Sequence, residues 1–142
     1  MDTDPRNGMT ILPESACLQL LSNAEIGRLA VAVDGRPDIF PVNHLVHDGE
    51  IYIRTAEGSK LISVAINEWV AFEVDGFNQD ENTAWSVVVH GTAESVDTVE
   101  VEDFVAALPL HPWNTAPKNR FIRISPTAIS GREFVAEGRT VS

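Results

Sequence analysis

Apolar and polar residues alternate along six stretches of the chain, and a period of two residues is typical of β-strands with one buried face. In the stretch 27–33, with the sequence GRLAVAV, the larger apolar side chains Leu29, Val31 and Val33 lie on one side and two alanines on the other. The remaining stretches are residues 38–47, 51–55, 69–77, 83–94 and 120–130. The pattern therefore predicts six strands.

Turn residues between these stretches indicate how the strands pair. The sequence DGRP at 34–37 turns the chain, and Asp48-Gly49 separates the second and third strands. Glycine accepts the positive φ of a tight hairpin turn, so these two strands are predicted to be antiparallel neighbours. Pro41 has no N–H, which predicts a sheet edge or a bulge at that position. Ser125-Pro126 predicts a bulge in the last strand.

Three shorter stretches have the spacing of amphipathic helices: residues 13–23, 59–68 and 97–108. In the first, Pro13 suits the first helical turn, and Cys17, Leu18 and Leu21 fall on one face. Six strands joined mostly by hairpins, with two or three short helices, predict a mainly β protein built as an antiparallel β-barrel with helices at its ends. We expect one domain over residues 1–142, with residues 1–12 as a loose N-terminal arm.

Charge and composition narrow the classes of function. The 142 residues carry a net charge of −11, and 44% of them are hydrophobic. An acidic protein repels nucleic-acid backbones and anionic lipid, which argues against a general nucleic-acid or membrane partner. No long apolar run suggests a transmembrane helix, so we expect a cytoplasmic protein. Cys17 is the only cysteine, which excludes an internal disulfide.

One corner of this acidic chain gathers cationic and hydroxyl side chains. Arg54 and Thr55 end a predicted strand, and Ser59 and Lys60 open a predicted helix. The free N–H groups of a helix N-terminus stabilise an anion, so a phosphate pocket is one interpretation. The alternative is that Ser59 only caps the helix while Arg54 and Lys60 pair with nearby acids such as Glu50 or Glu57.

The remaining reactive residues do not form a recognisable catalytic motif. His44 and His47 point to opposite faces of a strand, and the spacing of the four histidines does not converge on one metal ion. Neither a Gly-x-Ser-x-Gly motif nor a glycine-rich dinucleotide motif is present in the sequence. We therefore predict neither a metal site nor a catalytic acid, base or nucleophile supplied by the protein.

The three tryptophans call for different interpretations. Trp69 follows a predicted helix, and core packing is the simplest interpretation. Trp85 shares one strand face with Val87 and Val89, and this pattern also favours the core. Trp113 lies in a proline-rich loop, where tryptophan can cover a flat ligand, dock on another subunit or simply pack.

Taken together and in order, these segments resemble a known family. The run GRLAVAVDGRPDIFPVNHLVHDGEIYIRTAEGSKL, followed by VAFEVDGF and WSVVVHGTAE, is similar to the flavin-binding split-barrel family related to pyridoxamine 5′-phosphate oxidase. The likeness covers about residues 13–134 and is greatest to short actinobacterial-type members and their nitroimidazole-resistance-like relatives. It implies a six-stranded antiparallel split β-barrel that forms a homodimer, with FMN at the interface.

The resemblance also assigns roles to individual residues. Those at the cationic corner would hold the FMN phosphate: Arg54, Thr55, Ser59 and Lys60. Those on the second strand would run beside the isoalloxazine ring: Pro41, Val42 and Asn43. A third set would line or cover the cofactor: Trp85, Ser86 and Trp113, the last one from the partner subunit.

The implied activity is that of an FMN-dependent oxidoreductase. The flavin would carry the redox chemistry, with nitro or quinone-type compounds as substrates and a nicotinamide as electron donor. The C-terminal basic and aromatic elements that hold substrate in the true oxidase are missing, which argues against pyridoxamine phosphate oxidation. The alternatives are a deazaflavin as cofactor, or a binding module without turnover for a flavin, deazaflavin or haem-type ligand.

Overall fold

A computed structural model describes residues 3, 8–55, 65, 68–97, 101 and 120–136, with backbone only at 55, 97 and 120. It contains one helix and seven strands in these residues. In chain order they are β1 (Thr10–Leu12), α1 (Glu14–Asn23), β2 (Ile26–Val33), β3 (Arg36–His47), β4 (Glu50–Thr55), β5 (Trp69–Asn78), β6 (Thr83–Asp97) and β7 (Arg120–Val135).

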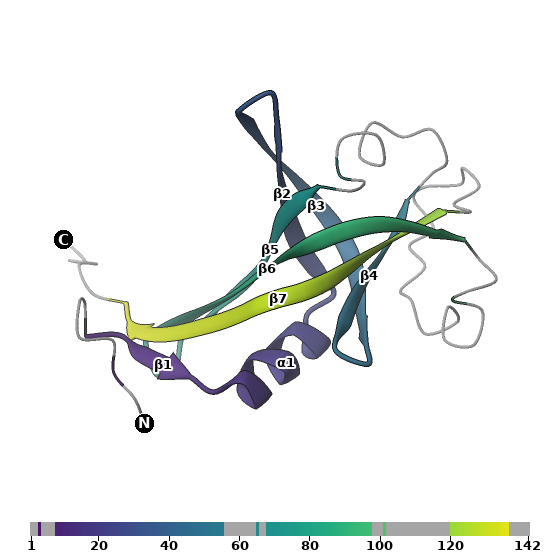
Figure 1. Ribbon diagram of the computed structural model, residues 1–142. Helices are drawn as coiled ribbons and strands as arrows, with labels where there is room; N and C mark the ends of the chain where they lie inside the picture. The colour runs from purple at the N-terminus through teal and green to yellow at the C-terminus, as the bar shows by residue number, and fades with distance from the viewer. Residues whose placement is uncertain are drawn as a thin grey trace.

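The strands close into a ring. The sheet order is β1-β7-β4-β3-β2-β5-β6, and β6 pairs with β7 as well, so β2 to β7 form a closed barrel in which every pairing is antiparallel. Figure 1 shows β6 and β7 as two long neighbouring strands, with the β2–β3 hairpin projecting from the barrel. The predicted mainly β, six-stranded barrel is confirmed.

The N-terminal arm differs from the prediction, because Thr10–Leu12 form a seventh strand. β4 covers only one end of β7, from Arg120 to Ile124, and leaves the other end of that edge open. β1 pairs there, with Thr10 opposite Glu133 and Leu12 opposite Gly131. Three residues are too few for an alternation pattern, so the strand is visible only through its partner. The helices predicted at 59–68 and 97–108 fall largely outside the described residues.

The turns follow the sequence signals. Asp48 and Gly49 have φ of 50° and 76°, and Asp34 and Gly35 have φ of 52° and 75°. Positive φ at both central residues is the geometry of a two-residue hairpin turn that matches strand twist. The predicted bulge in β7 is also present: the register with β6 shifts between His90 and Gly91, which pair with Ala128 and Pro126. Thr127 is the extra residue.

Alternate residues of the strands fill the barrel with apolar side chains. The largest fully buried members are Phe72, Leu29, Ile51, Ile53, Ile122 and Ile124, together with Leu21 of α1. Phe121 is also fully buried, but in a second cluster with Tyr52, Val96 and Val101. α1 packs against β3, β6 and β7 and contributes the buried Cys17 and Leu21. The predicted apolar face of α1 is therefore confirmed at these two positions.

Candidate functional site at the divergence of β3 and β4

β3 and β4 pair over only four residues and then separate. Their register runs from His47 opposite Glu50 to His44 opposite Ile53, and no pair follows beyond it among the described residues. β3 continues as the partner of β2 alone back to Arg36. Among the described residues, the side of β3 that faces away from β2 therefore has no strand partner before His44. The part of this side next to the divergence, residues 41–43, is referred to below as the open edge.

Backbone groups of two predicted cofactor residues face this open edge. The His44 N–H donates to the Glu25 carbonyl at 3.2 Å, on the β2 side. Because strand backbone groups alternate in direction, the N–H and C=O of Asn43 and the C=O of Pro41 turn to the other side. The missing N–H of Pro41 therefore removes no bond from the β2–β3 ladder. The prediction of an edge position for Pro41 is confirmed.

Side chains on both sides of the divergence share the outer face of the barrel. Val42 packs against the buried core, so its neighbours Pro41 and Asn43 lie on the outer face. In β4, Ile53 is fully buried, and Arg54 takes the outer face next to it. The Arg54 guanidinium lies 6.0 Å from the centroid of the Phe121 ring. A cation from β4 and an amide from β3 thus stand on the same face of adjoining strands.

Glu50, one of the acids considered as a partner for Arg54, has partners on other strands. Its carboxylate accepts a hydrogen bond from the Ser125 hydroxyl at 2.8 Å and lies 3.8 Å from Arg123 Nε. Arg123 in turn binds the Glu94 carboxylate. Glu50 is thus engaged by two side chains of β7, Ser125 and Arg123.

A second ion-pair group lies on β2 and β5, on the other side of β3 from the open edge. Arg28 is opposite Pro41 in the β2–β3 register, and its Nη1 lies 3.2 Å from Glu73 and 2.8 Å from Asp75. Burial, followed by the neighbouring Asp75, raises the pKa of Glu73. The Arg28 charge is thus matched by two carboxylates. This group was not predictable from the sequence, since its members come from strands more than forty residues apart.

Trp85 and Ser86 lie near the opposite end of β6. Val96 of β6 pairs with Phe121, the neighbour of Arg54, and Trp85 lies eleven positions further along the strand. At about 3.3 Å per residue this is roughly 35 Å along the strand. As neighbours in one strand, Trp85 and Ser86 point to opposite faces of the sheet. Trp85 packs against the core and across Gly76, where an added Cβ would lie 2.6 Å from its ring. Within one chain, Trp85 and Ser86 therefore do not lie next to Arg54.

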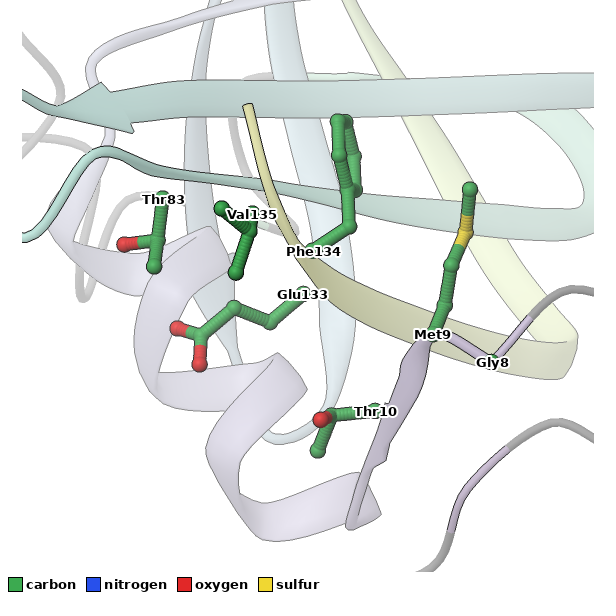
Figure 2. A pocket seen from close by; sticks show the side chains of 7 residues that line it. All are labelled: Gly8, Met9, Thr10, Thr83, Glu133, Phe134 and Val135. Atoms are coloured by element: carbon green, nitrogen blue, oxygen red, sulfur yellow. The ribbon is translucent and has the colours of Figure 1, made fainter. Parts of the chain in front are cut away.

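The far end of the sheet carries a cavity of its own, which the sequence did not reveal. It encloses about 410 Å³ and is lined by Gly8, Met9, Thr10, Thr83, Glu133, Phe134 and Val135 (Figure 2). Glu133 pairs with Trp85 on one side and Thr10 on the other. Trp85 therefore belongs to this end of the sheet. The cavity depends on β1, the strand that the hydrophobic pattern missed.

The other predicted residues are only partly described. The Thr55 backbone pairs with Arg120 at the end of β4. Ser59, Lys60 and Trp113 lie outside the described residues, and their roles remain predictions. Within the described part of the chain, no group of three His, Cys, Asp or Glu side chains could hold a metal ion. No helix in the same part is long and apolar enough to span a membrane.

A closed antiparallel ring in which two neighbouring strands diverge defines a split β-barrel. The sequence of residues 13–133 matches the family model described as pyridoxamine 5′-phosphate oxidase, and the chain belongs to this family. The resemblance inferred from the motifs is thereby confirmed.

Three relatives show how close the match is. An uncharacterized protein of Mycobacterium tuberculosis, Rv0080, is 35% identical over 91% of this chain and 88% of its own length. The structure of the FAD binding protein from Mycobacterium smegmatis is 36% identical, with a TM-score of 0.74, covering 88% of this chain and 98% of that one. A putative pyridoxamine 5′-phosphate oxidase from Corynebacterium glutamicum is 39% identical, with a TM-score of 0.75, covering 97% and 99%.

Proposed function

We propose that this protein binds a flavin at the open edge of β3 and uses it as an oxidoreductase. The observation that carries the proposal is the juxtaposition of that edge with Arg54 on the outer face of the barrel. The similarity to the FAD binding protein from Mycobacterium smegmatis supports a flavin as the ligand.

The residues on the two strands suit the two ends of a flavin. The isoalloxazine ring carries hydrogen-bond donors and acceptors along one edge, and the backbone groups of Pro41 and Asn43 that turn away from β2 are their complement. Arg54 offers a fixed cation for the phosphate at the other end. Ser59 and Lys60 are expected to add a hydroxyl and a second cation. The bound flavin supplies the redox chemistry, and the chain supplies binding and orientation.

FMN is the cofactor that the sequence predicted, but FAD is an equally suitable candidate for these residues. Both carry phosphate on the ribityl chain, which is the group that Arg54 would bind. The related Mycobacterium smegmatis structure is described as FAD binding. A deazaflavin has the same phosphate and remains the third candidate. The three ligands are therefore compared in one titration.

A second copy of the chain would complete the site. Arg54 and Trp85 are separated along the strands by more than the length of FMN, so one molecule bound in a single chain cannot reach both. If a partner turns its Trp85 end toward the open edge, both sets of predicted residues meet at one ligand. We therefore include a homodimer with the cofactor at its interface in the proposal.

The first experiment is a titration of the purified protein with FMN, FAD and a deazaflavin, followed by visible absorbance and by flavin fluorescence. Arg54→Ala should weaken binding at least about tenfold, since a charge-assisted phosphate contact contributes about 1.5–3 kcal/mol. Lys60→Ala should do the same. Arg36→Ala removes an exposed cation at the turn end of β3, five residues before the open edge begins at Pro41. It is the matched control and should bind like the unaltered protein. A protein that takes up none of the three ligands would refute the proposal.

A second experiment separates an oxidoreductase from a binding module. The flavin-loaded protein is mixed anaerobically with NADH or NADPH, and bleaching of the flavin absorbance is recorded. A nitroaromatic compound or a quinone is then added as the oxidant. Reduction followed by reoxidation supports the enzyme, whereas a flavin that binds tightly but accepts no electrons from either donor supports the module.

A further inference from the structure

His44 occupies the point at which the open edge begins. It is the last residue of β3 to pair with β4, and Asn43 is the first residue of the open edge. The side chain is only 2% exposed, unlike that of His47 on the opposite face of the same strand. A histidine buried this deeply is uncommon, and here it stands beside the proposed ligand site.

Two hydrogen bonds at His44 fasten the end of α1 to β3. The ring Nε2 lies 2.8 Å from the Leu21 carbonyl, so Nε2 carries the proton and donates. Leu21 is in the last turn of α1, where carbonyl groups lack helical partners. The His44 backbone N–H donates to the Glu25 carbonyl, directly after the helix. One residue thus satisfies a carbonyl group in the last helical turn and another just after the helix.

The other ring nitrogen lies in an apolar enclosure. Nδ1 is buried and has no hydrogen-bond partner among the described residues. The ring meets the fully buried Phe72 edge to face, with centroids 4.9 Å apart. A proton on Nδ1 would place a positive charge and an unsatisfied donor in this enclosure.

The charged groups on the surrounding elements face away from the ring. Strand alternation puts Arg28 of β2, Tyr52 and Arg54 of β4 and Glu73 and Asp75 of β5 on the outer face of the barrel. Glu14 of α1 and Glu25 after it are exposed, and burial raises the pKa of the Cys17 thiol and keeps it neutral. Burial is also the main cause that lowers the pKa of His44, against the opposing backbone hydrogen bonds.

We propose that His44 is a positioning residue for the ligand at the open edge: its neutral imidazole holds the end of α1 on β3, and protonation of the ring releases the edge formed by Pro41, Val42 and Asn43. The inference rests on the proposed flavin site for its ligand. It adds that ligand affinity falls in mild acid while the rest of the barrel stays folded.

The test compares flavin affinity from about pH 7.5 to about pH 4.5, a range that extends below the ordinary titration of histidine because burial lowers the pKa of His44. Uptake of one proton by the free form can weaken binding by up to about tenfold per pH unit. The flavin affinity of the unaltered protein should fall at least about tenfold over this range. In His44→Gln the side-chain amide can donate to Leu21 but does not titrate. The flavin affinity of this variant should fall less than about threefold. His47→Gln is the matched control on the opposite face and should behave like the unaltered protein. An equal loss in His44→Gln and the unaltered protein would overturn the inference.

Hydrogen exchange without any flavin gives a readout that is independent of the proposed function. After correction for the intrinsic pH dependence of exchange, residues 40–45 should lose protection in acid in the unaltered protein but not in His44→Gln. The β6 strand should stay protected in both. If no flavin binds at any pH, the proposed function fails, and the exchange result alone decides the role of His44. Unchanged protection of residues 40–45 in acid would reject that role.

Discussion

The phenyl ring of Phe72 lies directly across Gly27, so that a Cβ added to Gly27 would come within 2.2 Å of Phe72 Cζ. The same ring contacts His44, at the beginning of the open edge. Gly27 therefore has a steric role, because the absence of its side chain makes room for an aromatic ring that packs against the base of the proposed site.

Gly27→Ala tests this contact. The added methyl group overlaps a fully buried ring, so we expect a loss of about 1–3 kcal/mol in the free energy of unfolding. Urea unfolding measures it. Ala32→Val, which adds methyl groups to the exposed outer face of the same strand, is the control and should change stability by less than about 0.5 kcal/mol. Equal effects of the two substitutions would show that the ring is free to shift.

Gly131 makes a similar close contact with α1. A Cβ on Gly131 would lie 2.5 Å from Cys17 Sγ. Gly131→Ala should therefore push α1 away from β7 and lower stability by about 1–3 kcal/mol. Cys17→Ala removes the sulfur, so the double variant should recover at least about 0.5 kcal/mol relative to the sum of the two single changes. Strict additivity in this cycle would contradict the contact.

The network around Arg123 predicts a graded series. Arg123 binds Glu94 and lies 3.8 Å from Glu50, which also accepts from Ser125. Arg123→Ala leaves two partly exposed carboxylates without this cation and should destabilise the protein by about 0.5–1 kcal/mol. Arg123→Lys keeps the charge but not the planar geometry, so its stability should fall between those of the unaltered protein and Arg123→Ala. Thermal unfolding at low and high salt measures the series, and a loss of equal size in both variants would assign the effect to packing.

Glu73 predicts a dependence of stability on pH with a definite sign. Its pKa in the folded protein is raised, mainly by burial and then by Asp75, so the folded state binds a proton more readily than the unfolded chain. This contribution to stability is present at low pH and is lost as pH rises through the raised pKa. Glu73→Gln should therefore be neutral or stabilising at pH 7. Asp75→Asn, which removes the shorter bond to Arg28, should be destabilising. Denaturant unfolding between pH 4 and pH 7 distinguishes the two variants. A clear loss of stability in Glu73→Gln at pH 7 would contradict the raised pKa of Glu73.

The strands and turns of the barrel were predictable from the sequence because their signals are local. Alternation located β2 to β7, and Asp48-Gly49 fixed one hairpin through the positive φ of both residues. β1 was not predictable, because its three residues become a strand only through the free end of β7. Closure of the ring by β6 and β7 also depends on contacts between distant residues.

The candidate site was likewise predictable only in part. Pro41 signalled an edge by its chemistry alone, and the motif around Arg54 marked a cationic strand end. The position of His44 under that edge, and the distance from Arg54 to Trp85, follow from strand register and could not be read from spacing. Most of the phosphate-binding motif, with Ser59 and Lys60, lies outside the described residues and remains a prediction.

Closure of the ring by β7 has a consequence for synthesis of the protein. Residues 120–135 pair with β1, β4 and β6, and they follow all of these strands in the chain. While the chain emerges from the ribosome, β4 and β6 therefore present unpaired edges until β7 arrives. Such edges readily pair with those of other chains. We expect the nascent protein to be most prone to aggregation in this interval, and a chain that stops before residue 120 to remain in that state.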